Sequence, residues 1–146
     1  MRAKVLAQRD DLRMLCLGFD SDEEVVGTLT GFLRDHQVTA ARFTAIGAFS
    51  DVVLGYFDWD RKAYLPIEVH EQVEVLSLLG DVALEGSQPK AHAHAVLGRR
   101  DGSTCGGHLM KAHVRPTLEL ILDESPGYLR KEYDAQAHLP LIKIGT

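Results

Sequence analysis

Residues 90–109, KAHAHAVLGRRDGSTCGGHL, have the pattern of a β-hairpin. In the first arm histidine and alanine alternate with a period of two, so His92 and His94 share one face of a strand and the alanines share the other. The polar run ending in Asp101-Gly102 indicates a turn, and the second arm carries His108. We therefore predict two antiparallel strands that bring histidines together.

The length of the turn decides whether His108 faces the other two histidines. A two-residue loop would pair His94 with Leu109 and would point His108 to the opposite face. A three-residue loop, Arg100-Asp101-Gly102, would be a type I turn completed by glycine in the left-handed region, and it would place His94 directly across from His108. Because opposed β-carbons lie about 4.5 to 5.5 Å apart, three imidazoles could then converge on one ion.

His92, His94 and His108 form a donor set that suits zinc or another borderline divalent metal. Three protein ligands leave a fourth position open for water or a small-molecule oxygen, whereas structural zinc sites are typically closed by four ligands. A water at that position could have its pKa lowered and act as a nucleophile or base. Histidines at alternating positions also occur on solvated strand faces, so the spacing alone leaves both interpretations open.

Glu74 is the first candidate for a catalytic carboxylate, because it lies inside the apolar run 73–80. A buried carboxylate is costly unless it is paired, so Glu74 is either a general base or outer-shell partner of the site, or it faces water or another subunit. Glu71 is a second catalytic candidate, and Glu119 is a further outer-shell one. Of the remaining histidines, His36 is interpreted as a helix-end group. His70 and His113 could approach the site, but the first interpretation of each is an ordinary surface group, and His138 is assigned no function.

The 146 residues suit a single domain, 1–146, with a core over about 10–125 and a C-terminal extension, 126–146, that packs back. With 16 Lys and Arg against 21 Asp and Glu, the net charge is -5, which disfavours binding to a nucleic-acid backbone. There is no apolar run of the length that a membrane span needs and no signal peptide pattern. Two cysteines, Cys16 and Cys105, do not make a disulfide framework, so we expect a cytoplasmic protein.

The rest of the chain predicts an α+β fold, with a mostly antiparallel sheet and one main flanking helix over about 22–36. Ser21 is the expected N-cap, with Glu24 as its capping-box partner, and apolar residues then recur at helical spacing. Further strands are expected at 12–19, 41–46, 52–57, 63–69, 72–79, 81–84, 90–97, 104–109 and 117–123.

Several short motifs occur in a fixed order along residues 10–125: Gly47-Ala48-Phe49-Ser50, Glu74-Val75-Leu76-Ser77-Leu78-Leu79-Gly80, His92-x-His94-x-x-Leu97, Asp101-Gly102, Gly106-Gly107-His108-Leu109 and Thr117-x-Glu119. In this order they resemble the PPC family, the "plants and prokaryotes conserved" domain. The resemblance implies an α+β domain assembled as a homotrimer. It also implies a DNA-binding or regulatory role, since plant members carry the domain behind an AT-hook.

This chain departs from the plant pattern because it has no Arg-Gly-Arg-Pro AT-hook and is acidic, so direct DNA binding is disfavoured. The family fold is also similar to that of acetolactate decarboxylase, a zinc enzyme with a His-x-His pair and a later histidine. Carried onto this chain, those ligands would be His92, His94 and His108.

Two functions therefore remain open on the sequence. One is a trimeric regulatory domain of the DNA-binding type that carries a three-histidine metal site. The other is a small zinc-dependent lyase or hydrolase that takes a small-molecule ligand at the metal and has no role on DNA.

Overall fold

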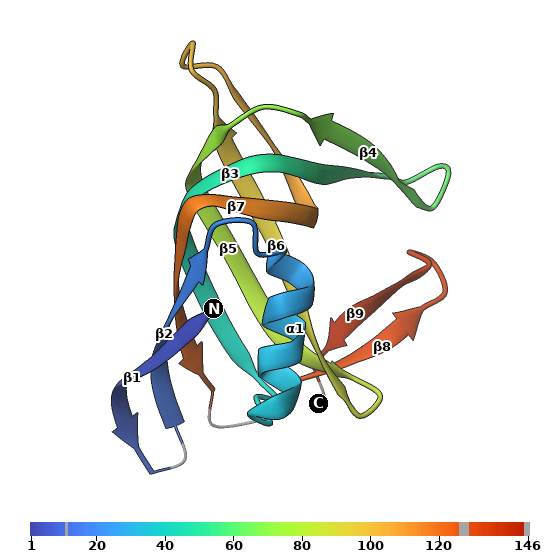
Figure 1. The fold of residues 1–146 in the computed structure, drawn as a ribbon. Coiled ribbons are helices and arrows are strands. Elements are labelled where there is room, and N and C mark those ends of the chain that lie inside the picture. Colours follow the sequence, from blue (N-terminus) through green and yellow to red (C-terminus); the bar gives the residue numbers. More distant parts are fainter. Residues whose placement is uncertain (11, 126–128, 145–146) are drawn as a thin grey trace.

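The computed structural model describes residues 1–10, 12–125 and 129–144. Their elements, in chain order, are β1 (Arg2–Arg9), β2 (Leu12–Asp20), α1 (Val25–Asp35), β3 (Ala41–Asp58), β4 (Ala63–Val69), β5 (Val73–Glu85), β6 (Gln88–Gly98), β7 (Thr104–Glu124), β8 (Arg130–Asp134) and β9 (Leu139–Lys143). The expected α+β class, with one main helix and a mostly antiparallel sheet, is confirmed for these residues (Figure 1).

Four long strands form a closed circuit that defines the body of the fold. β3 pairs with β5, β5 with β6, β6 with β7, and β7 again with β3, all antiparallel. β1 and β2 extend the sheet beyond β7, and β4 pairs with the second half of β3. The fold therefore holds β6, the strand with two histidines, between two neighbours.

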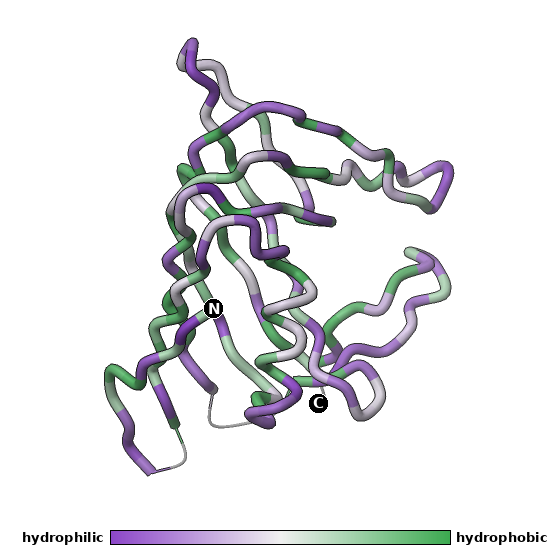
Figure 2. The backbone as a smooth tube through the Cα atoms, viewed as in Figure 1, coloured by the Kyte–Doolittle hydropathy of each residue, from purple (hydrophilic) through white to green (hydrophobic). Residues whose placement is uncertain are grey.

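The core lies between this circuit and α1, which packs against β6 and β7 (Figure 1). Leu29 and Leu33 of α1 are buried in the same cluster as Ala93 and Ala95 of β6. The alanine face of β6 therefore points into the core, as the alternation predicts, and the histidine face points outward. Figure 2 shows residue hydropathy along the backbone, with hydrophilic residues at the tips of the β3–β4 and β6–β7 loops.

The helix begins later than the sequence indicates. Its N-cap is Glu24, whose carboxylate accepts hydrogen bonds from the backbone N–H groups of Val26 and Gly27, and α1 runs from Val25. Ser21, the expected cap, instead donates to the carbonyl of Pro116. A backbone carbonyl of the distant strand β7 thus replaces the capping-box partner of Ser21, and α1 begins three residues after the expected start at about 22.

Several expected breaks between strands are bends within one strand. The expected strands 41–46 and 52–57 are both part of β3, which continues through Gly47 with a register shift between Ala45 and Gly47. The expected strands at 72–79 and 81–84 likewise merge into β5, and those at 104–109 and 117–123 merge into β7. Glycines and bulges bend these strands without ending their hydrogen-bonded ladders.

β1, β8 and β9 carry no clear alternation and were not expected as strands. Every residue of β1 is exposed, and this strand is held by its pairing with β2. The expected C-terminal extension does return to the sheet: β8 pairs in parallel with the end of β5, at Leu84 and Glu85. Residues 126–128 and 145–146 of that extension lie outside the described residues.

The two cysteines, Cys16 and Cys105, are free thiols, each partly buried. The helix in the described part of the chain is too short to cross a membrane.

Candidate metal centre

The turn between β6 and β7 has the three-residue form. The backbone N–H of Arg99 donates to the carbonyl of Ser103 (2.8 Å), and that of Gly102 donates to the carbonyl of Arg99 (2.9 Å). Gly102 has a φ of 83°, a conformation that glycine adopts without a steric cost. The resulting register pairs His94 with His108, which confirms the pairing predicted for the longer loop.

The three histidines His92, His94 and His108 form a nearly equilateral triangle. The ring centroids are 5.1 Å apart for His92 and His94, 5.0 Å for His92 and His108, and 5.5 Å for His94 and His108. One ring nitrogen from each lies within 4.8 Å of the others. His92 and His108 are partly buried and His94 is exposed, so the cluster has a protein-covered side and an open side.

Burial keeps two of the imidazoles neutral. It lowers the pKa of His108 from 6.5 to about 4, with smaller contributions from the charges of His92 and His94. Burial also lowers the pKa of His94. Because a metal binds the neutral form of imidazole, these rings have their lone pairs available at pH 7.

The chemistry and burial of the three imidazoles fit a zinc-like ion. His108 Nδ1 is buried and has no hydrogen-bond partner among the described residues, which is costly for a polar atom unless something else satisfies it. Tetrahedral zinc with bonds of 2.0–2.1 Å holds nitrogen ligands about 3.4 Å apart. One nitrogen from each of the three rings lies within 4.8 Å of the others, which is near that separation.

Tyr64 and Asp81 support the histidines from either side. The ring of Tyr64, on β4, stacks on His108 with centroids 4.6 Å apart and planes 24° from parallel. Asp81, on β5, places Oδ2 3.5 Å from Nδ1 of His92. This interaction with His92 lowers the pKa of Asp81, so the carboxylate is ionised and orients the imidazole, an arrangement typical of metal-binding histidines.

Asp81 was not among the candidate carboxylates, yet a local signal points to it. The turn Gly86-Ser87 closes a two-residue β5–β6 hairpin in which Glu85 pairs with Gln88. Counting back from that pair brings Asp81 opposite His92. The register reasoning that placed His108 therefore also finds Asp81 when it is applied to the preceding hairpin.

The proposed carboxylates lie away from the histidines. Glu74 is exposed and pairs with Gly98 near the start of β5, whereas Asp81 pairs with His92 farther along the same strand. Glu71 forms a salt bridge to Arg99, with a distance of 2.9 Å from Nε to Oε1. Glu119 is exposed on the second half of β7, where it pairs with β2 and β3. The structure brings the three histidines together and does not bring these glutamates to them.

The other histidines have local partners. His36 is the C-cap of α1, as its position at the helix end suggested, and stacks on the ring of Phe32. The remaining contacts are His70 with Glu68, His113 with Asp51, and His138 near the ring of Tyr133.

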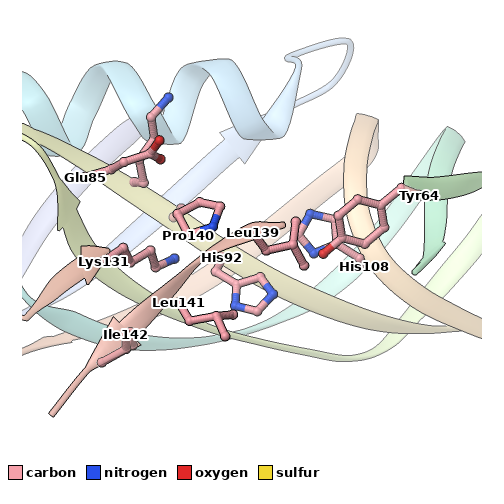
Figure 3. Close-up of a pocket in the computed structure, with 11 residues that line it drawn as sticks. Tyr64, Glu85, His92, His108, Lys131, Leu139, Pro140, Leu141 and Ile142 are labelled. Atoms are coloured by element: carbon pink, nitrogen blue, oxygen red, sulfur yellow. The ribbon is translucent and has the colours of Figure 1, made fainter. Parts of the chain in front are cut away.

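A pocket of about 410 Å³ opens beside the cluster. Two of the histidines, His92 and His108, line it together with Tyr64 (Figure 3). The opposite wall comes from the C-terminal hairpin: Lys131 of β8 and Leu139, Pro140, Leu141 and Ile142 of β9. The sequence suggested that these apolar tail residues are covered, but it contained no indication that they face the histidines.

Comparison with known proteins gives a consistent family. The family model of the Plants and Prokaryotes Conserved (PCC) domain matches residues 7–126. Among solved structures, the chain is similar to a plant- and prokaryote-conserved (PPC) protein of Pyrococcus horikoshii, at 27% identity and a TM-score of 0.85, over 92% of this chain and 93% of that one. No curated protein sequence matches the chain.

Two further solved structures carry functional descriptions. A metal-containing protein of Archaeoglobus fulgidus is 31% identical, with a TM-score of 0.83 over 99% of both chains. A "putative DNA-binding protein" of Bacteroides thetaiotaomicron is 23% identical, with a TM-score of 0.85 over 94% of both chains, and shows the fold alone.

The expected likeness to acetolactate decarboxylase is confirmed at the level of fold. A Staphylococcus aureus protein of unknown function similar to that enzyme has a TM-score of 0.56 at 8% identity, over 77% of this chain and 53% of that one.

Proposed function

The chain belongs to the Plants and Prokaryotes Conserved domain family, and from that premise we propose that it is a metal-binding member that holds one divalent ion of the zinc class on His92, His94 and His108. The convergence of three imidazoles, one with a buried nitrogen that lacks a partner, carries the proposal. The description of the 31% identical Archaeoglobus relative as a metal-containing protein supports it.

An ion with three protein ligands can accept a further oxygen ligand and supplies Lewis-acid chemistry when bound. The chain's own residues prepare the site for this role: Asp81 orients His92, and Tyr64 covers one face of His108. Burial raises the pKa of the Tyr64 phenol, so at neutral pH it remains a hydrogen-bond donor beside the pocket. This arrangement suits binding and polarisation of a small oxygen-containing molecule, in line with the enzyme alternative.

Metal content tests the proposal directly. We expect about one equivalent of zinc-class metal per chain in native protein and close to none in His92→Ala or His94→Ala, because two imidazoles hold such an ion much more weakly than three. Elemental analysis after gel filtration measures this. His70→Ala is the matched control, since it removes an exposed imidazole outside the cluster. Equal metal content in all four proteins would overturn the site.

We propose that the protein assembles as a homotrimer through the outer face of the sheet beside the histidines. Leu79 is the cross-strand partner of His94, and Val96 lies two residues along the same face of β6. These apolar side chains are 57% and 45% exposed, and adjacent apolar exposure on a sheet face marks an interaction surface. The family resemblance supplies the expected number of subunits.

Solution mass distinguishes this assembly from a monomer. We expect a particle of three times the 16.1 kDa chain mass by sedimentation equilibrium, and dissociation when Leu79→Glu and Val96→Glu place buried charges in the interface. Trp59→Glu, at another exposed apolar position, should leave the mass unchanged. A monomeric mass for the native chain would rule out the trimer.

The DNA-binding role ranks below metal binding for this chain. It is supported by the description of structural neighbours at 23% identity, whereas the net charge of -5 opposes contact with a phosphate backbone.

A further inference from the structure

The C-terminal hairpin of β8 and β9 forms one wall of the pocket beside the histidine cluster, opposite His92 and His108. It lies beyond residue 126, where the family match ends, and docks through the parallel pairing of β8 with β5. This pairing sets Lys131 opposite Glu85 in the ladder, and the Lys131 side chain reaches from there to Asp81, earlier in β5. The chemistry of the hairpin's inner side therefore decides what the pocket can accept.

Lys131 places a buried positive charge at the metal side of this pocket. Its side chain is only 8% exposed, and Nζ lies 3.6 Å from Oδ1 of Asp81, which is longer than an ordinary hydrogen bond. Asp81 also contacts His92, so one carboxylate connects the ammonium group to the cluster. Figure 3 shows the ammonium group pointing toward His92 across the pocket. A buried ammonium whose nearest anion is beyond hydrogen-bonding distance is suited to bind the oxygen of a ligand.

The charges around the pocket favour an anion once a metal is bound. Lys131 is balanced by Asp81, whose Oδ1 lies 3.6 Å from Nζ, and the pocket lining holds one further lysine and one further carboxylate, Lys90 and Glu85. The imidazoles contribute no formal charge in their neutral form. The two positive charges of a divalent ion therefore remain unbalanced, and a ligand oxyanion would offset them.

The hairpin also supplies an apolar wall, made by consecutive residues of β9: Leu139, Pro140, Leu141 and Ile142. A wall of this kind favours a hydrocarbon group over a fully hydrated ion such as phosphate. The ligand must therefore combine one anionic head with a short aliphatic part.

We propose that the pocket binds a small aliphatic carboxylate, with its head group between the metal and Lys131 and its hydrocarbon chain against β9. The inference rests on the proposed metal site and adds the ligand class. A carboxylate has two oxygens, so one can reach the ion while the other accepts from the ammonium group.

Titration of the cobalt-loaded protein with 3-methylbutanoate tests this, because the visible spectrum of Co²⁺ at a histidine site reports a new oxygen ligand. We expect a saturable spectral change and an affinity for acetate about tenfold weaker, since acetate lacks the chain that packs on β9. In Lys131→Met, affinity for 3-methylbutanoate should fall by about tenfold or more. Lys143→Met is the matched control: it removes an exposed lysine of the same hairpin, whose partner is Glu132, and should leave affinity unchanged.

The outcomes separate the two proposals. If cobalt does not bind, the metal site fails and the ligand proposal fails with it. If cobalt binds in all variants but 3-methylbutanoate has no effect, binds equally well to Lys131→Met, or is outcompeted by inorganic phosphate at equal concentration, only the ligand class is wrong. Cobalt stoichiometry in each variant reports that the histidine site is intact.

Discussion

Alanine at Gly47 is expected to lower the free energy of unfolding by about 4 kcal/mol or more, the largest effect of any single methyl group that we predict. A β-carbon at this position would lie 2.2 Å from the carbonyl oxygen of Thr117 and 2.8 Å from Cα of Leu118. Both atoms belong to the backbone of β7, so they cannot move aside as a side chain would. The φ of 151° adds strain for any residue with a β-carbon.

Urea denaturation monitored by circular dichroism measures this effect. Gly31→Ala provides the control: a β-carbon there meets nothing within 4 Å, and alanine in a helix is favoured over glycine by about 1 kcal/mol. The two substitutions should therefore change stability in opposite directions. A Gly47→Ala protein within about 1 kcal/mol of the native chain would contradict the close approach of β3 and β7.

Zinc is expected to stabilise the native protein by about 2.7 kcal/mol when its free concentration is one hundred times the dissociation constant. This follows from linkage, because the folded chain presents three converged imidazoles and the unfolded chain does not. For a chain of this length the melting temperature should rise by roughly 8 °C. In His108→Ala the zinc-dependent rise should largely disappear.

The comparison is made within each protein, with and without zinc, because removing His108 also uncovers the ring of Tyr64 and changes the stability of the metal-free form. His113→Ala serves as the control, since this histidine is bound to Asp51 away from the cluster. Differential scanning calorimetry supplies both melting temperatures. A zinc-dependent rise that survives in His108→Ala, or that disappears in His113→Ala, would show that the ion binds elsewhere.

The sequence reduced the histidine register to two alternatives, because the register depends on the length of one short turn. The loop length at Arg100-Asp101-Gly102 sets which residue faces His94. In the structure Gly102 has the left-handed conformation of the three-residue loop, and His94 therefore faces His108. The position of Asp81 is determined in the same local way by Gly86-Ser87, so the sequence contained that signal too. Hairpin geometry places these side chains without reference to the rest of the chain.

The helix boundary and the strand bends depended on distant partners. The backbone carbonyl of Pro116 accepts a hydrogen bond from the hydroxyl group of Ser21, and Glu24 caps α1 instead. At Gly47 the chain continues as one strand because β5 and β7 pair with it on both sides. Turn propensity indicates a break at such a position, and ladder hydrogen bonds from neighbouring strands outweigh it.

By itself the sequence determined the α+β class, the outward histidine face of β6 and the three candidate metal ligands, because alternation and short turns act over a few residues. Only the tertiary structure decided that Lys131 and the apolar residues of β9 face those ligands. Their placement requires β8 to pair with β5, more than forty residues earlier in the chain. That contact is a backbone ladder between strands far apart in the chain, and no local sequence pattern encodes such a pairing.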